Sequence, residues 1–331
     1  MNTVIVFGGS GFVGTHLVYE LLRKYEKIVI ADIKTPGWHE GSVKLENNKV
    51  EYVYCDVRNK IELADYGRNV NCIINLAAVH TSPGYPARDY FEANISGAKN
   101  ICNYANMAGC NRIIFTSSIS VYGPGEDEKH EEHIPMPNIP YGVSKIIAEY
   151  IHREWYNFAS NTRMLTIIRP GVIFGRGEGG NFTRMANALQ KGLFIYPGRK
   201  DTIKACVYVK DVCNFIIEMT NVNKGYSLLN FCYPQKITIE EIVKTFKDTL
   251  GYNTPELVLP FKLIVQGTSV LNRLPIKTIR TMGLVPERIE KLIKSTNISS
   301  QKLIRSGFKF RYSLENAIMD WAGECKGKKL Y

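Results

Sequence analysis

The sequence predicts an α/β fold in which a doubly wound parallel sheet is followed by a smaller C-terminal domain. Short β-branched runs alternate with helical patterns in the first half, a glycine-rich segment joins the first strand to the first helix, and the alternation stops near residue 170. A chain of 331 residues has room for one large domain and one small one. Because 45% of the residues are hydrophobic and 22% are charged, the chain is suited to a buried core rather than to disorder.

The predicted elements follow in order along the chain. Alternating strands and helices keep the strands parallel and cover both faces of the sheet. Beyond the sheet, two segments have the pattern of amphipathic helices. We therefore expect a first domain over residues 1–170 and a second mainly over 171–331, with some segments returning to the first. The strands are expected at 3–7, 27–31, 50–55, 72–75, 113–117 and 165–169, and the helices at 12–24, 90–108, 141–158, 236–250 and 313–321.

Composition and charge narrow the class of protein. No stretch approaches the roughly 18 apolar residues of a membrane helix, and the apolar segment 260–274 contains polar residues that favour a packed helix. The eight cysteines form no CxxC pair, which favours reduced thiols in a cytoplasmic protein over a zinc site. The net charge is +11, and residues 236–331 hold 17 Lys and Arg against 9 Asp and Glu. This excess of positive charge suits an anionic substrate, an anionic membrane surface or an ordinary solvated surface. We expect no nucleic acid partner, because the sequence contains no recognition module. We also expect no metal.

A glycine-rich loop follows the first strand and opens the first helix. Gly8, Gly11 and Gly14 permit a tight turn, close approach of backbone N–H groups to a pyrophosphate, and close packing of helix on strand. Phe12 and Val13 lie between the last two glycines. The context predicts a Rossmann-type dinucleotide site, in which all five residues contact the cofactor.

An acidic residue at the end of the second strand indicates which dinucleotide binds. The Asp32 carboxylate is placed to accept hydrogen bonds from the adenosine ribose hydroxyls, and it would repel a 2′-phosphate. The cofactor is therefore predicted to be NAD rather than NADP. Lys34 lies two residues further on, and its positive charge would offset part of the repulsion between Asp32 and the 2′-phosphate of NADP.

Two later strand ends extend the predicted cofactor site. Asp56 and Val57 follow the third strand, where an Asp can accept from the adenine amino group. Leu76, Ala77 and Ala78 follow the fourth strand and are small enough to let a cofactor lie against the backbone. The carboxyl ends of parallel strands meet at one edge, where open α/β sheets bind ligands.

A serine cluster and a Tyr–Lys pair supply candidate catalytic groups. Ser118 follows the fifth strand, and Tyr141 and Lys145 lie four residues apart at the start of a helix, on one face. A phenol with a pKa near 10 needs about 4 kcal/mol of preferential phenolate stabilisation to act as a base at neutral pH. The Lys145 ammonium and a positive nicotinamide are the predicted sources of that stabilisation.

Together these residues resemble the extended short-chain dehydrogenases/reductases, in the NAD-dependent nucleotide-sugar epimerase/dehydratase branch. The resemblance implies that Tyr141 is the general acid/base, that Lys145 lowers its pKa and binds the nicotinamide ribose, and that Ser118 hydrogen-bonds the reacting sugar oxygen. It covers most of the chain. The motifs in family order are Gly8 to Gly14, Asp32, Asp56, the Ser118 cluster, Tyr141 to Lys145, Arg169-Pro170 and residues 207–212.

Departures from sister patterns narrow the implied reaction. The 4,6-dehydratases of the family carry Asp and Glu where this chain has Ile119 and Ser120. Ile119 cannot transfer a proton and Ser120 is a poor acid, so dehydration is disfavoured. The predicted reaction is 4-epimerisation of a UDP-hexose or UDP-N-acetylhexosamine through a 4-keto intermediate. The alternatives are an NAD(P)H-dependent nucleotide-4-keto-6-deoxyhexose reductase and a non-catalytic NAD-binding sensor.

The resemblance also implies a nucleotide-sugar substrate and a homodimer. Asn181 and Lys204 match positions that contact the diphosphate, although epimerases of the family usually carry Arg in place of Lys204, and Arg280 is a further candidate. His80 corresponds to a position on the nicotinamide side of the pocket, or else it is an ordinary loop histidine. Helices 90–108 and 141–158 are expected to pair with their copies in a dimer. Part of a stripe at Ile147, Ile151 and Trp155 would meet the partner.

Overall fold

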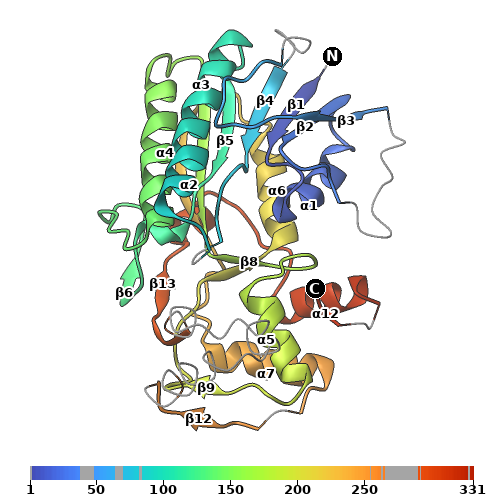
Figure 1. Cartoon of the computed structure of the whole chain (residues 1–331), viewed down its shortest axis with the longest axis vertical. Coiled ribbons are helices and arrows are strands. Elements are labelled where there is room, and N and C mark those ends of the chain that lie inside the picture. Colours follow the sequence, from blue (N-terminus) through green and yellow to red (C-terminus); the bar gives the residue numbers. More distant parts are fainter. Residues whose placement is uncertain are drawn as a thin grey trace. The chain divides into compact units, whose positions relative to one another are not determined.

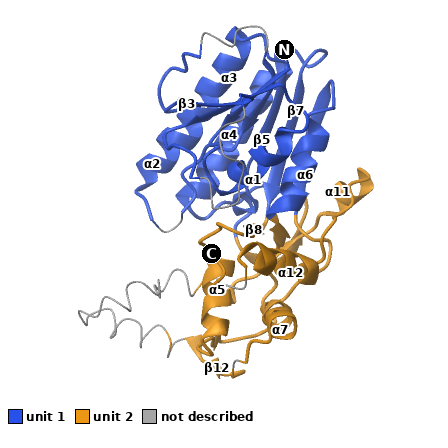
Figure 2. Ribbon diagram, turned by 90° about the vertical axis from the view of Figure 1, so that its right-hand side faces the viewer, with its two compact units in different colours: residues 1–123, 131–170, 209–231 blue, residues 124–130, 171–208, 232–331 orange. Residues whose placement is uncertain are grey.

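The computed structural model describes residues 2–37, 48–63, 70–81, 84–253, 255–261, 264, 290, 292–326 and 329–331. The chain divides into two compact units (Figure 2). Unit 1 comprises residues 1–123, 131–170 and 209–231, and unit 2 comprises residues 124–130, 171–208 and 232–331. Among the described residues, no helix has both the length and the apolar character needed to cross a membrane.

Unit 1 contains a seven-stranded sheet in which every neighbouring pair is parallel (Figure 1). Its order, β11-β7-β5-β4-β1-β2-β3, reverses direction between β1 and β4, which makes this the Rossmann-type doubly wound sheet predicted from the sequence. The strands are β1 (Thr3–Phe7), β2 (Lys27–Asp32), β3 (Val50–Tyr54), β4 (Val70–Asn75), β5 (Arg112–Thr116), β7 (Met164–Pro170) and β11 (Gly225–Phe231). The six predicted strands are all present: β1 has the predicted bounds, and the ends of the other five differ from prediction by at most two residues.

Helices cover both faces of this sheet. Alternate strand residues such as Ile5, Ile73 and Leu165 form one core with α3 and α4, which lie side by side in Figure 1. The intervening strand residues are also buried, and α1 and α6 pack against each other. The β1–α1–β2 crossover leaves the switch point in the direction opposite to β4–α3–β5 and β5–α4–β7, so right-handed connections place α1 on the face opposite α3 and α4. Helix α6, which precedes β11, packs against α1. The helices are α1 (Phe12–Leu21), α2 (Ala87–Phe91), α3 (Gly97–Met107), α4 (Pro140–Asn157) and α6 (Val209–Met219).

The helix predicted at residues 90–108 is interrupted. A π-helix, η2 (Glu92–Ser96), separates α2 from α3. Within it, the buried Asn94 side chain accepts a hydrogen bond from Val79 N and donates to Val79 O and to the Ser144 hydroxyl. The hydrophobic periodicity of the sequence does not reveal this wider turn, because the turn positions a polar side chain, Asn94, rather than an apolar one.

Unit 2 is built from small parallel strand pairs and helices around an aromatic core that includes Phe174, Phe246 and Trp321. A capping box between Thr238 and Glu241 starts α7, and Gly251, in the left-handed region at φ 67°, ends it. The strand pairs are β6 (Gly125–Lys129) with β13 (Thr296–Ile298), β8 (Val172–Phe174) with β10 (Cys206–Tyr208), and β9 (Tyr196–Pro197) with β12 (Val258–Leu259). The helices are α5 (Asn181–Gln190), α7 (Ile239–Leu250), α11 (Gln301–Arg305) and α12 (Leu314–Glu324).

We expect Gly14→Ala to destabilise the protein. A Cβ at residue 14 would lie 2.5 Å from the Gly9 carbonyl oxygen, so the β1–α1 turn would have to move. Overpacking of this kind costs about 1–3 kcal/mol. Gly37→Ala is the matched control, because a Cβ there meets no atom within 4 Å. Thermal unfolding should show a lower Tm for Gly14→Ala only; equal Tm values for both variants would contradict the turn geometry.

Candidate active site

Ser118 and Tyr141 come together at the carboxyl edge of the sheet. Ser118 caps the 3-10 turn η3 (Ile119–Val121), where its Oγ accepts a hydrogen bond from Ser120 N at 3.1 Å. Tyr141 is the second residue of α4, and a side-chain hydrogen bond joins it to Ser118. The close approach depends on Gly142, where a Cβ would lie 2.4 Å from the Ser120 carbonyl oxygen.

Lys145 lies one turn further along α4 and is 2% exposed. Its Nζ is 4.5 Å from the centre of the Phe115 ring, and no described residue accepts a hydrogen bond from it. Burial lowers the pKa of Lys145 to about 7, while the charge of Glu149 acts in the opposite direction. The ammonium is thus close to its titration point at neutral pH.

Burial raises the pKa of Tyr141 to about 12, although the Ser118 hydrogen bond acts to lower it. The phenol therefore holds its proton at neutral pH in this structure. Bringing that pKa to near 7 takes about 7 kcal/mol of preferential phenolate stabilisation, more than an unburied phenol would need.

The glycine loop packs against the residues that follow β4. Gly8 has φ 75°, and a Cβ on it would lie 2.6 Å from Ala77 N, so only glycine permits this contact. The loop also touches the end of β2, where Asp32 Oδ2 accepts a hydrogen bond from Ser10 N at 3.0 Å. Ser10 Oγ is buried and has no hydrogen-bond partner. Gly11 caps α1 without a side chain, which leaves the N–H groups of the first turn available to an anion.

The other predicted cofactor residues lie on the same edge. Asn75 ends β4, and its Oδ1 accepts a hydrogen bond from Ala77 N, which fixes the turn carrying Leu76, Ala77 and Ala78. Hydrogen bonds from Arg58 lower the pKa of Asp56, which holds this guanidinium through both carboxylate oxygens. Together with Asn59, Glu92 and Ser96, these two residues line a polar cavity beside Val57.

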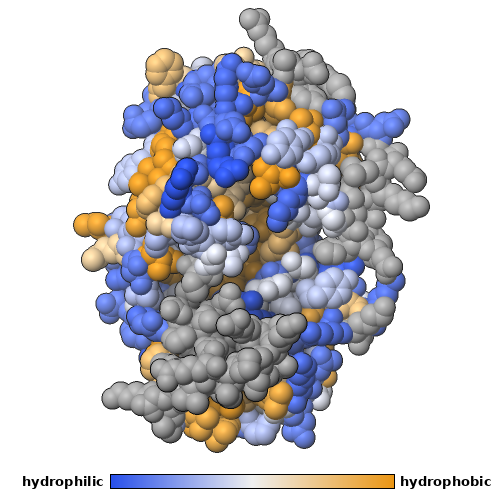
Figure 3. All heavy atoms as spheres, viewed as in Figure 1, coloured by the Kyte–Doolittle hydropathy of each residue, from blue (hydrophilic) through white to orange (hydrophobic). Residues whose placement is uncertain are grey.

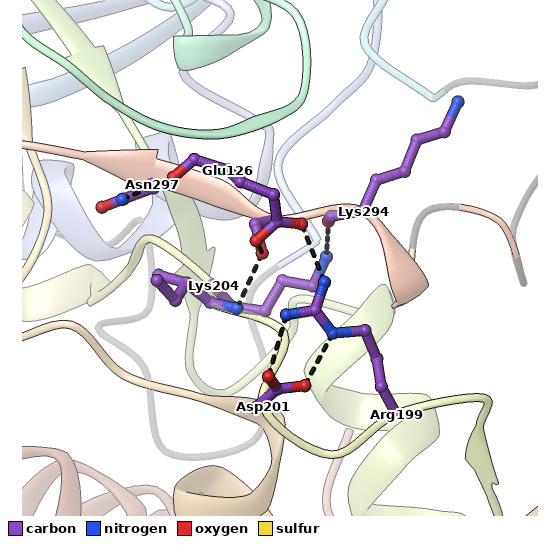
Figure 4. A network of polar contacts seen from close by, with 8 residues as sticks. Glu126, Arg199, Asp201, Lys204, Lys294 and Asn297 are labelled. Carbon is purple, nitrogen blue, oxygen red and sulfur yellow. Dashed lines mark hydrogen bonds and ion pairs between the residues drawn. The ribbon is translucent and has the colours of Figure 1, made fainter.

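Two of the predicted substrate contacts lie in unit 2, and each has protein partners there. Asn181 Oδ1 accepts a hydrogen bond from Arg184 Nη2 at 2.9 Å. Lys204 Nζ donates to the Lys294 carbonyl oxygen, as Figure 4 shows, and burial lowers the pKa of Lys204 to about 7. Arg280 lies outside the described residues.

The Lys204 surroundings are dense in charge. Arg199 donates to both carboxylate oxygens of Asp201 and to Glu126 Oε1 at 2.9 Å. The other oxygen of Glu126 accepts from the Ser295 hydroxyl, and its carbonyl accepts from Asn297 (Figure 4).

His80, the remaining predicted substrate contact, belongs to unit 1, where it follows β4 and is exposed.

The site also contains polar residues that sequence reasoning did not assign. Asn94 fixes the main chain at Val79, one residue before His80. Glu149 forms a buried ion pair with Arg169 directly below Lys145 on α4. The spacing of Glu149, four residues after Lys145, was a signal available in the sequence, whereas the π-helix that places Asn94 was not.

Comparisons with known proteins agree with this fold. The model of the 3-beta hydroxysteroid dehydrogenase/isomerase family matches residues 5–224. The chain is 30% identical, over 96% of its length and 93% of the relative, to the N-acetyl-alpha-D-glucosaminyl-diphospho-ditrans,octacis-undecaprenol 4-epimerase of Escherichia coli O157:H7.

Among solved structures, the UDP-N-acetylglucosamine 4-epimerase of Methanobrevibacter ruminantium M1 in complex with UDP-N-acetylmuramic acid has a TM-score of 0.76. Its sequence identity is 19%, with 97% of this chain and 99% of that chain covered. MoeE5 in complex with UDP-glucuronic acid and NAD has a TM-score of 0.75 at 19% identity, with 98% and 99% covered. Sequence motifs, sheet order and these matches agree, and the chain belongs to the 3-beta hydroxysteroid dehydrogenase/isomerase family, in the nucleotide-sugar epimerase/dehydratase branch of the extended short-chain dehydrogenases/reductases.

Proposed function

We propose that the chain is an NAD-dependent 4-epimerase of a hexose or N-acetylhexosamine joined to a diphosphate. The observation that carries the proposal is the hydrogen bond between Ser118 and Tyr141, with Lys145 one turn further along α4 and with Ile119 and Ser120 following Ser118. These two residues supply no acid–base pair for elimination, so the site is equipped for hydride transfer alone. The 30% identity to a 4-epimerase over nearly the whole chain supports the same reaction.

The residues of unit 1 fit NAD. The N–H groups of the α1 first turn, which no side chain caps, suit the pyrophosphate; Asp32 suits the ribose hydroxyls, and the unpartnered Ser10 Oγ offers a further hydrogen bond. The polar cavity beside Asp56 suits the adenine end. The chemistry that bound NAD would supply at this site is reversible uptake of hydride from the sugar carbon.

The side chains of the site handle the proton. Tyr141, once ionised, accepts the proton of the sugar 4-hydroxyl as the hydride leaves C4, and returns it after the 4-keto sugar has turned over. Ser118 donates a hydrogen bond to the same oxygen, and the Lys145 ammonium stabilises the phenolate. The Lys145 ammonium, together with a positive nicotinamide when NAD is bound, would offset the burial that holds the proton on Tyr141.

The substrate class rests on the shared chemistry of the relatives. The Escherichia coli relative takes its sugar on undecaprenol diphosphate, and several related structures contain UDP-sugars. Both kinds of molecule present a hexose on a diphosphate. Asn181 and Lys204 are the groups that we propose to contact this diphosphate, with Arg280 as a third. A diphosphate anchor leaves the 4-keto hexose free to swing and present its other face.

We expect interconversion of a gluco and a galacto epimer without added cofactor. The protein is incubated with UDP-N-acetylglucosamine, UDP-glucose, their galacto epimers, and undecaprenyl diphosphate carrying N-acetylglucosamine, and products are followed by proton NMR at the anomeric position. Tyr141→Phe should lose about 10²–10⁴ in turnover. Tyr19→Phe, on the exposed side of α1, is the control and should keep it.

The same experiment separates the competing functions. Conversion of only the lipid-linked sugar would assign the lipid diphosphate as substrate and exclude the UDP-sugars. Consumption of NAD(P)H with a UDP-4-keto-6-deoxy sugar, with no epimerisation anywhere, would replace the epimerase by the reductase. Bound NAD that is released on denaturation, with no turnover of any substrate, would identify the sensor.

The cofactor preference should follow Asp32. We expect NAD(H) to bind at least about tenfold more tightly than NADP(H), a difference of ~1.4 kcal/mol, because the carboxylate beside the glycine loop repels a 2′-phosphate. Nicotinamide fluorescence titration measures both affinities. Asp32→Asn should reduce the difference between the NAD(H) and NADP(H) affinities. Equal affinities in the unmodified protein would show that Lys34, rather than Asp32, determines which cofactor binds.

We further propose a homodimer formed through α3 and α4. Trp155 is part of the core and Ile151 packs against it, so these two side chains face their own sheet rather than a partner. Ile147 and Tyr150 are 37% and 53% exposed on α4. Figure 3 shows apolar residues among polar ones over the side of unit 1 on which Figure 1 draws these helices.

Sedimentation should give a dimer at micromolar concentration. Ile147→Glu should shift it toward monomer, because a charge would be buried in the α4 pairing. Ile134→Glu is the control, since Ile134 is 82% exposed in the loop before α4. A monomer for the unmodified protein would contradict the proposal.

A further inference from the structure

Three ionisable side chains recur every fourth residue along one face of α4. Tyr141 is followed by Lys145 and then by Glu149, and the last two are 2% and 1% exposed. Side chains four apart on a helix are neighbours. The candidate catalytic face of α4 thus continues inward, past Lys145, to a buried carboxylate.

Glu149 is held by Ser117, which directly follows β5, and by Arg169 of β7. Its Oε1 accepts hydrogen bonds from the Ser117 hydroxyl and from Arg169 Nε at 2.9 Å, and its Oε2 accepts from Arg169 Nη2 at 2.6 Å. Ser117 directly precedes Ser118 at the end of β5. Arg169 lies in β7 and is 3% exposed, so the pair is a two-pronged ion pair shielded from water.

The ion pair continues into a fixed polar network. Arg169 Nη1 donates to the Tyr122 hydroxyl at 2.7 Å, and that hydroxyl donates to Asn230 Oδ1 at 2.9 Å. The main-chain N–H of Asn230 in turn donates to Glu131 Oε1. Because every connection is buried, neither charged group of the pair can turn away to solvent.

The groups around Lys145 leave Glu149 as its main counter-charge. His152 Nδ1 donates to the Ala148 carbonyl, so its Nε2 accepts from Asn75 and the ring is neutral; burial lowers its pKa to about 4. Partial desolvation and the Lys145 charge also lower the pKa of His80. From α2, the Tyr90 ring lies beside that of Tyr141, with ring centres 6.2 Å apart.

We propose that the buried Glu149–Arg169 ion pair sets the charge of Lys145 and, through Ser117, the placement of Ser118, so that both residues act on Tyr141 as positioning residues. The structural part of this inference depends only on contacts within unit 1. Its consequence for turnover rests on the proposed function.

The two partners act in opposite directions. The negative Glu149 favours the proton on Lys145, so its loss moves Lys145 deprotonation to lower pH. Arg169 neutralises much of that negative charge, so its loss leaves Glu149 unpaired and moves Lys145 deprotonation to higher pH. An opposite charge within about 4–6 Å shifts a pKa by about 1–3 units, so shifts of about one pH unit are expected.

The test follows Lys145 directly, without substrate. The Cε signal of Lys145 in ¹³C-lysine-labelled protein is assigned by its loss in Lys145→Met and titrated with pH. The unmodified protein should titrate near 7, Glu149→Gln lower and Arg169→Gln higher. Arg169→Lys keeps the charge and should stay near the unmodified value. Lys27→Gln, which breaks a surface ion pair with Glu51, is the control for general loss of a charge.

A purely structural ion pair would give a different pattern. Both single variants would then lose stability without moving the Lys145 midpoint, or would move it in the same direction, and either result overturns the proposal. If a single variant does not fold because it leaves a buried charge unpaired, Glu149→Gln with Arg169→Gln removes both charges. In that double variant the two opposite effects should largely cancel, so a Lys145 midpoint that moves by more than about one pH unit in either direction refutes the proposal.

The activity readout separates this inference from the proposed function. Where an epimerase substrate is found, the pH profile of kcat/KM should move with the Lys145 midpoint in each variant. Opposite NMR shifts without any turnover would leave the ion-pair inference intact and refute the epimerase. Turnover whose pH profile is the same in all variants would support the epimerase and refute the ion-pair inference.

Discussion

Burial of one face of α4 against the sheet is the constraint on which the rest of the site depends. The same helix supplies Ala148 and Trp155 to the core and carries Tyr141 and Lys145 at the sheet edge. A helix that packs this closely takes its polar side chains into a region with little water, where each charge needs a partner or a shifted pKa. The depressed pKa of Lys145, the raised pKa of Tyr141 and the Glu149–Arg169 pair all follow from that single packing arrangement.

Close main-chain approach at the same edge has a different physical origin. Gly8 against Ala77 and Gly142 against Ser120 are contacts between backbones, and a Cβ at either glycine would overlap with them. They bring the β1–α1 loop beside the β4 turn, and the start of α4 beside the serine turn. Tight backbone contacts therefore fix the frame, and buried charges set the chemistry within it.

The sequence was sufficient to predict the sheet, because β-branched runs and the glycine spacing are short-range features, and the observed strand order is the expected one. The Tyr–Lys spacing is also a short-range feature; the structure joins Tyr141 to Ser118 by a hydrogen bond and places Lys145 one turn further along α4. Burial was harder to predict, since it depends on the packing of distant segments. The stripe at Ile147, Ile151 and Trp155 has a clear helical period, yet the period alone could not tell which members face the sheet. Likewise, Lys204 matched a diphosphate-contact position in the sequence, whereas in the structure its ammonium donates to the Lys294 carbonyl.

Because Glu92–Ser96 forms a π-helix, the local fold depends on the number of residues in this segment as well as on their identity. A π turn holds one residue more than an α turn, so α2 and α3 are rotated out of the phase that a continuous α-helix would have, by about 100°. Deleting one residue from the segment would restore a regular helix but would turn Asn94 away from Val79 and Ser144. The number of residues in this segment therefore determines where Asn94 points, as its identity determines what it can bond. A relative with one residue fewer here would need other contacts to hold the chain after β4, even if it kept every motif residue.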